Sequence, residues 1–107
     1  MAGEMIRGNL DLLVMGVLQG GALHGYGIID ELRRRSDDTF DLPEGTVYPA
    51  LHRLERAGLL TSRWQQQAGR RRRVYELTPK GRAELAHKKD EWRMFVAAVG
   101  RVAGVTT

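Results

Sequence analysis

Apolar residues recur along this chain at spacings that predict four helices and one β-hairpin. Between residues 5 and 18 they occur almost all round a helix, as one stripe of larger side chains and a second face that includes small residues. The stripe comprises Ile6, Leu10, Leu13, Val14 and Val17, and the second face comprises Met5, Gly8, Asn9, Leu12 and Gly16. A helix that is apolar on two sides is buried on two sides. Because one small domain supplies a single core, the second face predicts contact with a partner.

Two glycines indicate where the first helix ends, and renewed helical spacing of apolar residues predicts a second helix after them. Gly20-Gly21 ends the first helix, because glycine adopts the left-handed C-terminal conformation at little cost. A second helix is predicted from His24 to Arg35, with three arginines in its last turn, where cations complement the helix dipole. Residues 37–42 form a polar connection in which a short strand is an open alternative.

The third helix is predicted to begin within residues 43–46 and to end at Gly58. Its apolar residues form one buried stripe, Val47, Ala50, Leu51, Leu54 and Ala57. A hairpin follows, with strands over residues 59–67 and 72–78 and a turn at Ala68-Gly69. Thr78 and Pro79 then suit the N-cap and first position of a long last helix, which is expected to run to about Gly104.

Three helices followed by a two-stranded hairpin have the layout of a winged helix-turn-helix. The predicted fold is therefore mainly α with a small β-hairpin (α+β), plus a long C-terminal dimerisation helix. We expect a winged helix-turn-helix DNA-binding domain over residues 1–78 and the dimerisation helix over residues 79–107.

The distribution of charge indicates a surface that binds a polyanion. The net charge is +4, and residues 46–78 contain seven basic and two acidic residues. On composition alone, a solvated surface explains this excess equally well. The four consecutive arginines 70–73 are more specific, because their mutual repulsion has a cost for folding that contact with a phosphate backbone or a narrow minor groove would offset. A solubilising loop is the alternative for this cluster.

The third helix and the hairpin turn supply the candidate DNA-binding side chains. Arginine pairs bidentately with guanine or phosphate, whereas threonine, tyrosine and histidine bond phosphates or base edges. The candidates are Thr46, Tyr48, Pro49, His52, Arg53 and Arg56 on the helix, and Arg70, Arg71, Arg72 and Arg73 at the turn. An ordinary amphipathic helix with a solvated face is the alternative for the helix taken alone. The pattern leaves open whether Arg53 or Arg56 reads a base.

The last helix predicts a dimer interface beside a cavity. Leu85, Trp92 and Val99 recur every seven residues, as in a helix packed on another helix, although Lys88 and Lys89 interrupt the stripe. Packing this helix on the second face of another copy's first helix would bury both surfaces. The candidate effector or dimer-cavity residues are Met5, Gly8, Leu12, Trp92 and Val96. Trp92 either fills the interface or stacks on a planar effector.

Several classes of protein are disfavoured. The absence of cysteine excludes disulfides and thiolate zinc sites, and the three histidines lack partners at metal-site spacing. We therefore expect no metal, no cofactor and no catalytic site. No apolar run is long enough to span a membrane and no signal peptide is evident, so a cytoplasmic location is expected.

Three stretches resemble the PadR family of transcriptional regulators, named for a phenolic-acid-responsive repressor. Residues 24–28 resemble the family's Gly-Tyr second helix, and residues 45–60 resemble its recognition-helix signature GTLYPxLxRLExxGLI nearly throughout. Residues 71–81 resemble its wing and the start of its last helix, with Val74 where the family often has a second tyrosine. The resemblance extends from residue 4 to about residue 104.

The resemblance implies a repressor that binds double-stranded DNA as a homodimer and is released by a small molecule. The single C-terminal helix is similar to that of the compact subfamily, which dimerises through it. Some multidrug-sensing relatives place a tryptophan at the position matching Trp92, which favours a small aromatic or hydrophobic effector. Two alternatives stay open, a winged-helix protein-interaction module and a small-molecule carrier, and DNA affinity distinguishes them from a regulator.

Overall fold

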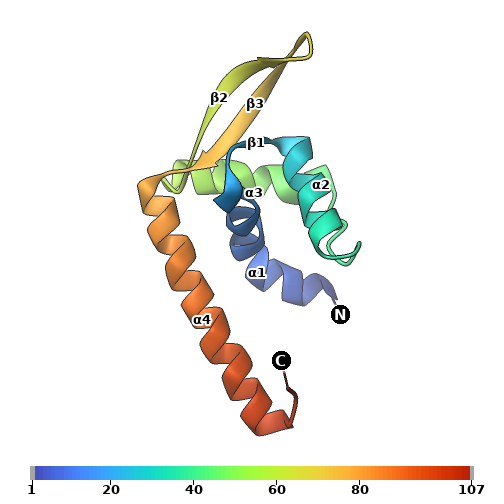
Figure 1. The fold of residues 1–107 in the computed structure, drawn as a ribbon, viewed down its shortest axis with the longest axis vertical. Helices are drawn as coiled ribbons and strands as arrows, with labels where there is room; N and C mark the ends of the chain where they lie inside the picture. The colour runs from blue at the N-terminus through green and yellow to red at the C-terminus, as the bar shows by residue number, and fades with distance from the viewer. Residues whose placement is uncertain (1, 107) are drawn as a thin grey trace.

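The computed structural model describes residues 2–106, and within that range the chain forms four α-helices and a small antiparallel sheet (Figure 1). In chain order the elements are α1 (Ala2–Val17), the 3-10 turn η1 (Leu18–Gly20), β1 (Leu23–His24), α2 (Gly25–Arg35), α3 (Glu44–Arg56), β2 (Leu60–Gln67), β3 (Arg70–Leu77) and α4 (Pro79–Ala103). The β2–β3 hairpin projects from the helical body as a wing, and α4 extends away on the other side (Figure 1). This is the predicted α+β winged helix-turn-helix with a long last helix. The domain division after residue 78 stays a prediction.

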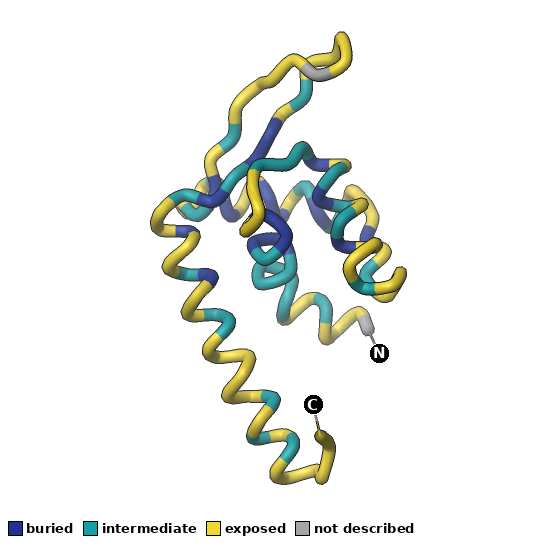
Figure 2. Tube along the Cα trace, viewed as in Figure 1, coloured by how far each residue is buried: buried dark blue, intermediate teal, exposed yellow. Residues whose placement is uncertain are grey.

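One apolar core joins the first three helices to the base of the hairpin. Its members include Val14 and Met15 of α1, Leu18 of η1, Ile28 and Leu32 of α2, Val47, Leu51 and Leu54 of α3, and Leu60, Tyr75 and Leu77 of the sheet. Figure 2 shows the buried segments gathered where these elements meet, whereas the hairpin tip and most of α4 are exposed. The core therefore fixes α3 and the base of the wing relative to each other.

The sheet contains three strands in the order β1-β3-β2, all antiparallel. Leu23 and His24 pair with Tyr75 and Val74, so the chain is extended just before α2 begins. The alternative of a short strand within residues 37–42 is wrong. The hydroxyl of Ser36 donates to the carbonyl of Leu32 and accepts the backbone N–H of Phe40, which closes a turn over the intervening residues.

Helix α4 begins where the sequence predicts. The hydroxyl of Thr78 accepts the backbone N–H of Gly81 at 3.0 Å, and Pro79 occupies the first turn. Gly81 also lies against the chain before β2, because an added Cβ would come within 2.0 Å of the Leu59 carbonyl oxygen. The start of the helix is thereby held against the body of the domain.

Beyond its first turns α4 leaves the core. Leu85 is buried, but further along the helix most of the large apolar side chains are exposed (Figure 2). These exposed side chains are Trp92, Met94, Phe95, Val99 and Val102. Among the described residues, α4 and the other helices lack the length and apolar character needed to cross a membrane.

Candidate nucleic-acid interface

Helix α3 separates a buried face from an exposed face. The buried face consists of Val47, Ala50, Leu51 and Leu54. Pro49, His52 and Arg56 lie on the opposite side and are exposed. Ala57, expected in the buried stripe, is exposed because the helix ends at Arg56 and the chain turns there. The outward face is therefore polar along most of its length and basic at its C-terminal end.

Two further predicted residues of α3 are half-buried at the edges of this face, Thr46 and Tyr48. The Tyr48 ring packs on the start of α2, where an added Cβ on Gly25 would lie 2.3 Å from the Tyr48 hydroxyl oxygen. Tyr26 meets it edge to face, with ring centroids 6.3 Å apart. Burial raises the pKa of Tyr48, so its hydroxyl stays protonated and can donate a hydrogen bond.

The wing arginines divide between the two faces of β3, because successive side chains of a strand point to opposite sides. Arg70 and Arg72 share the face toward α2, and a guanidinium nitrogen of Arg72 lies 2.9 Å from Nε2 of His24. Burial, and to a lesser extent the charge of Arg72, lowers the pKa of His24. His24 is therefore neutral near pH 7, and its Nδ1 accepts the Gly27 N–H at the start of α2.

The other face of the wing carries Trp64, which pairs across the strands with Arg73. The guanidinium carbons of Arg71 and Arg73 lie 4.8 and 5.4 Å from the centre of its ring, within cation–π range. Arg73 also donates to the Ser62 hydroxyl at 3.0 Å, and that hydroxyl donates to Glu55 of α3. This face thus links the wing to the recognition helix.

A hollow of about 240 Å³ lies between the wing and the start of α2. It is lined by His24, Gly25, Tyr26, Tyr48, Arg70, Arg71, Arg72 and Arg73. Arginine and tyrosine side chains that converge on a concave surface can bind a phosphate oxygen. Tyr26 is 52% exposed at the edge of this hollow.

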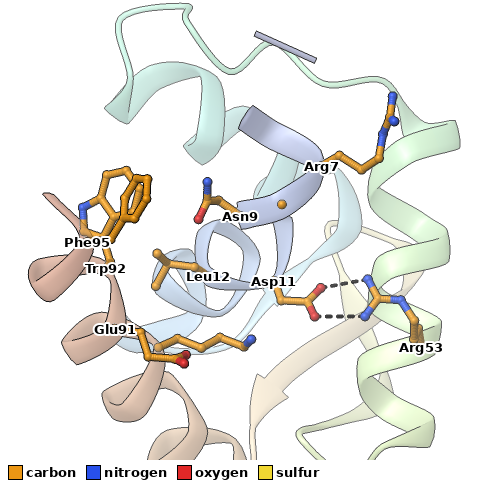
Figure 3. A pocket seen from close by; sticks show the side chains of 10 residues that line it. Arg7, Asn9, Asp11, Leu12, Arg53, Glu91, Trp92 and Phe95 are labelled. Carbon is orange, nitrogen blue, oxygen red and sulfur yellow. Dashed lines mark hydrogen bonds and ion pairs between the residues drawn. The ribbon is translucent and has the colours of Figure 1, made fainter. Parts of the chain in front are cut away.

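Arg53 does not share the outward face of α3. It turns toward α1, where its two terminal nitrogens donate to the two carboxylate oxygens of Asp11 at 2.8 and 2.9 Å (Figure 3). The bidentate bond raises the pKa of Arg53 further above its usual value. Asp11 is not identifiable as a functional residue from the sequence, because its partner lies 42 residues away.

One known family matches most of this chain. The sequence model of the transcriptional regulator PadR-like family matches residues 14–87. This chain belongs to the PadR-like family of transcriptional regulators. It is 38% identical over 86 residues to the transcriptional regulator Rv3488 of Mycobacterium tuberculosis, which covers 80% of this chain and 78% of that protein.

Two solved PadR structures have the same fold. A PadR family transcription regulator from Clostridium difficile superposes with a TM-score of 0.80 at 35% identity, covering 89% of this chain and 98% of that chain. Bacillus subtilis PadR in complex with operator DNA gives a TM-score of 0.66 at 28% identity, covering 73% of this chain and 44% of that chain. The family resemblance is confirmed. So is the expectation that the protein is not an enzyme, because the family and these neighbours are transcription regulators.

This chain also has a trough over α1, between α3 and α4. It measures about 560 Å³ and is lined by Arg7, Gly8, Asn9, Asp11, Leu12, Arg53, Lys88, Glu91, Trp92 and Phe95. In Figure 3, Trp92 and Phe95 of α4 lie across from Asn9 and Leu12, whereas Asp11 points to Arg53. The trough therefore has the two aromatic rings, with Glu91, on its α4 side and the Asp11–Arg53 pair on its α3 side.

A second, apolar hollow of about 360 Å³ shares Asn9, Leu12 and Trp92 with this trough. It is lined by Met5, Ile6, Asn9, Leu12, Leu13, Thr39, Phe40 and Trp92. Of the predicted cavity residues, Met5, Gly8, Leu12 and Trp92 line one hollow or both. Val96 is half-buried, and the lining of the trough includes its neighbour Phe95 instead.

Proposed function

We propose that this PadR-family regulator is a repressor that binds operator DNA with α3 in the major groove. The observation that carries the proposal is the exposed face of Pro49, His52 and Arg56, which lies opposite the buried stripe and beside a wing with four arginines. A recognition helix offers side chains of this kind to base edges. The operator complex of Bacillus subtilis PadR, whose fold is similar, supports the proposal.

The wing is proposed to hold the DNA backbone or the adjacent minor groove. Arg70 and Arg72 border the hollow that contains the Tyr26 and Tyr48 rings, which suits a phosphate. Arg71 and Arg73 are stacked on Trp64, so less side-chain freedom is lost when they bind. The two faces of β3 could then contact two different phosphates.

The proposed regulator acts as a homodimer. In a single chain α4 exposes an apolar surface, and Phe95, Ala98, Val99, Val102 and Ala103 line a further hollow of about 260 Å³ along it. Met5 of α1 is 66% exposed as well. A second copy that packs its α4 on α1 of this chain, and its α1 on α4 of this chain, would cover both surfaces. Such a two-fold dimer would require a pseudo-palindromic operator.

Release by a small aromatic or hydrophobic effector is the last part of the proposal. The apolar hollow beside Trp92 falls in the range of about 300–1,000 Å³ that is typical of small-ligand sites. The tryptophan ring is 40% exposed and offers a face on which a planar ligand can stack.

Selection of duplexes from a random-sequence pool, followed by gel-shift titration and footprinting, tests the proposal. We expect a symmetric footprint whose half-sites lie about one helical turn, roughly 10 bp, apart, with two chains per duplex. A single asymmetric half-site bound by one chain would contradict the dimeric mode. Failure to enrich any duplex would instead favour a protein-interaction module or a small-molecule carrier.

A further inference from the structure

The two arginines of α3 are in different environments. Arg53 is held by both carboxylate oxygens of Asp11, and the two side chains are 51% and 26% exposed. Arg56, by contrast, has no side-chain bond within the described part of the chain, and it is exposed. The sequence alone does not distinguish them, since both are basic positions outside the apolar stripe.

Their positions on the helix also differ. Arg56 follows His52 by four residues and Pro49 by seven, spacings that place all three on one face of an α-helix. Arg53 follows Thr46 by seven residues and therefore lies on the edge that half-buried Thr46 occupies, toward α1. The outward face of α3 thus contains Arg56, and the α1 edge contains Arg53.

For Arg53 to contact a base, it would have to give up two charge-assisted hydrogen bonds. The Asp11 carboxylate would then be an unpaired negative charge next to α3, and it would repel the phosphates of DNA bound by that helix. In the paired state the two charges cancel. The pair also links α1 to α3, and the planar guanidinium fixes both the distance and the direction of this link.

We infer that Arg53 is a positioning residue, which fixes α3 against α1 and neutralises Asp11 beside the DNA, and that Arg56 is the arginine of α3 that reads a base. The inference rests on the proposed mode of DNA binding. Asp11 becomes part of the DNA-binding apparatus although it does not contact DNA.

A charge-cancelling pair of substitutions tests the inference. Three proteins are compared: wild type, the single variant Arg53→Gln, and the double variant that carries both Asp11→Asn and Arg53→Gln. Each is titrated with a duplex selected by the wild type. We expect Arg53→Gln to weaken binding about tenfold and to lower the salt slope by about one, because an unpaired carboxylate offsets one phosphate contact. The double variant removes that carboxylate and lets two amides bond each other. It should recover to within about threefold of wild type, with the wild-type salt slope.

Arg56→Gln is the matched control on the same helix. We expect it to relax one operator position and to cost about fivefold to 150-fold in affinity, and Asp11→Asn should not rescue it. The inference would be overturned by a double variant that binds as weakly as Arg53→Gln, or by an Arg53→Gln variant that relaxes one operator position. Unchanged binding by Arg53→Gln would overturn it too.

Thermal unfolding of the same proteins separates this inference from the proposed function. A positioning role predicts that the midpoint of thermal unfolding is lower for Arg53→Gln and returns toward the wild-type value in the double variant. A wild-type midpoint for Arg53→Gln would contradict this role. If Arg53→Gln does not fold, Arg53→Lys replaces it: a base-reading role predicts one relaxed position, and a positioning role predicts uniform weakening. If the wild type selects no duplex, the proposed function fails, while the midpoints still test the link between α1 and α3.

Discussion

At the scale of single residues, the start of α2 carries two glycines in different surroundings. Gly25 lies against the Tyr48 ring, so a methyl group there would clash with the hydroxyl and the ring carbons. Gly27 has room, since an added Cβ would lie 3.6 Å from the His24 ring. The first glycine is therefore required by packing, and the second is not.

Replacement of these glycines by alanine tests that difference. We expect Gly25→Ala to lower the free energy of unfolding by about 1–3 kcal/mol, because the Tyr48 ring must shift from a packed position. Gly27→Ala should be neutral or stabilising by up to about 1 kcal/mol, because alanine favours the helix. Urea unfolding of both variants measures this, and equal losses would contradict the packing argument.

His24 makes the stability of the domain depend on pH. Burial, then Arg72, lowers its pKa below the usual 6.5, so the unfolded chain takes up this proton more readily than the folded chain. The resulting stability is present above the unfolded pKa and is lost as the pH falls toward the lower folded pKa. Protonation would also block Nδ1, the acceptor for the Gly27 N–H.

We therefore expect the free energy of unfolding to decrease as the pH falls through and below the usual histidine pKa of 6.5. His24→Asn keeps a side-chain oxygen at the N-cap but does not titrate, so it should flatten that part of the curve. Unfolding in urea at several pH values gives the comparison. A variant whose pH dependence matches that of wild type would show that His24 is not the source of the effect.

At the scale of elements, local patterns located most of the secondary structure. The apolar stripe of α3, the turn at residues 68–69 and the Thr78–Pro79 start of α4 are each determined by neighbours in sequence. Strand β1 was not predicted, because its two residues have no strand pattern of their own and become a strand by pairing with β3.

The candidate DNA-binding surface was located in outline but not in detail. Four consecutive arginines read as one cluster in the sequence, yet strand alternation divides them between His24 on one face and Trp64 on the other. Trp64 was identifiable in principle from the hairpin register, which places it opposite Arg73. The Asp11–Arg53 pair was not identifiable, because it depends on how α1 and α3 pack.

The role of Trp64 in the wing leads to a prediction about DNA affinity. Trp64→Ala removes the ring on which Arg71 and Arg73 stack. Each lost cation–π contact at an exposed site costs about 0.5–1 kcal/mol. We expect DNA binding to weaken about fivefold, while Trp64→Phe binds nearly as well as wild type. Gel-shift titration measures both, and Thr61→Ala, on the opposite face of β2, is the control. Wild-type affinity in Trp64→Ala would show that the stacking does not matter to DNA.

At the scale of the whole molecule, α4 is the element that a single chain leaves incomplete. Phe95 is 62% exposed and borders both the trough and the hollow further along α4, whereas Ala97 lies on another face of the helix. An aspartate at either position costs the helix a similar amount, since both are interior positions of α4. If the dimer interface lies on the face of α4 that contains Phe95, only the aspartate at position 95 should weaken dimerisation.

We expect Phe95→Asp to weaken dimerisation about a hundredfold, because a two-fold interface contains the buried charge twice. Ala97→Asp should dimerise like wild type. Light scattering over a range of concentrations measures the association, and gel shifts show whether operator binding is lost with it. Dimers of equal strength in both variants would place the interface elsewhere on the chain.

Trp92 lies where the predicted dimer, the trough and the apolar hollow meet, so its replacement tests whether the cavity binds ligands or is simply packing. The probe is anilinonaphthalene sulfonate, an aromatic dye that fluoresces in apolar sites. Trp92→Ala removes the stacking surface, and we expect dye affinity to fall about tenfold while light scattering still reports a dimer. Trp92→Phe keeps an aromatic face and should retain most of the affinity. If Trp92→Ala dissociates the dimer, the ring is an interface side chain, and if the dye binds unchanged, the ligand site does not include Trp92.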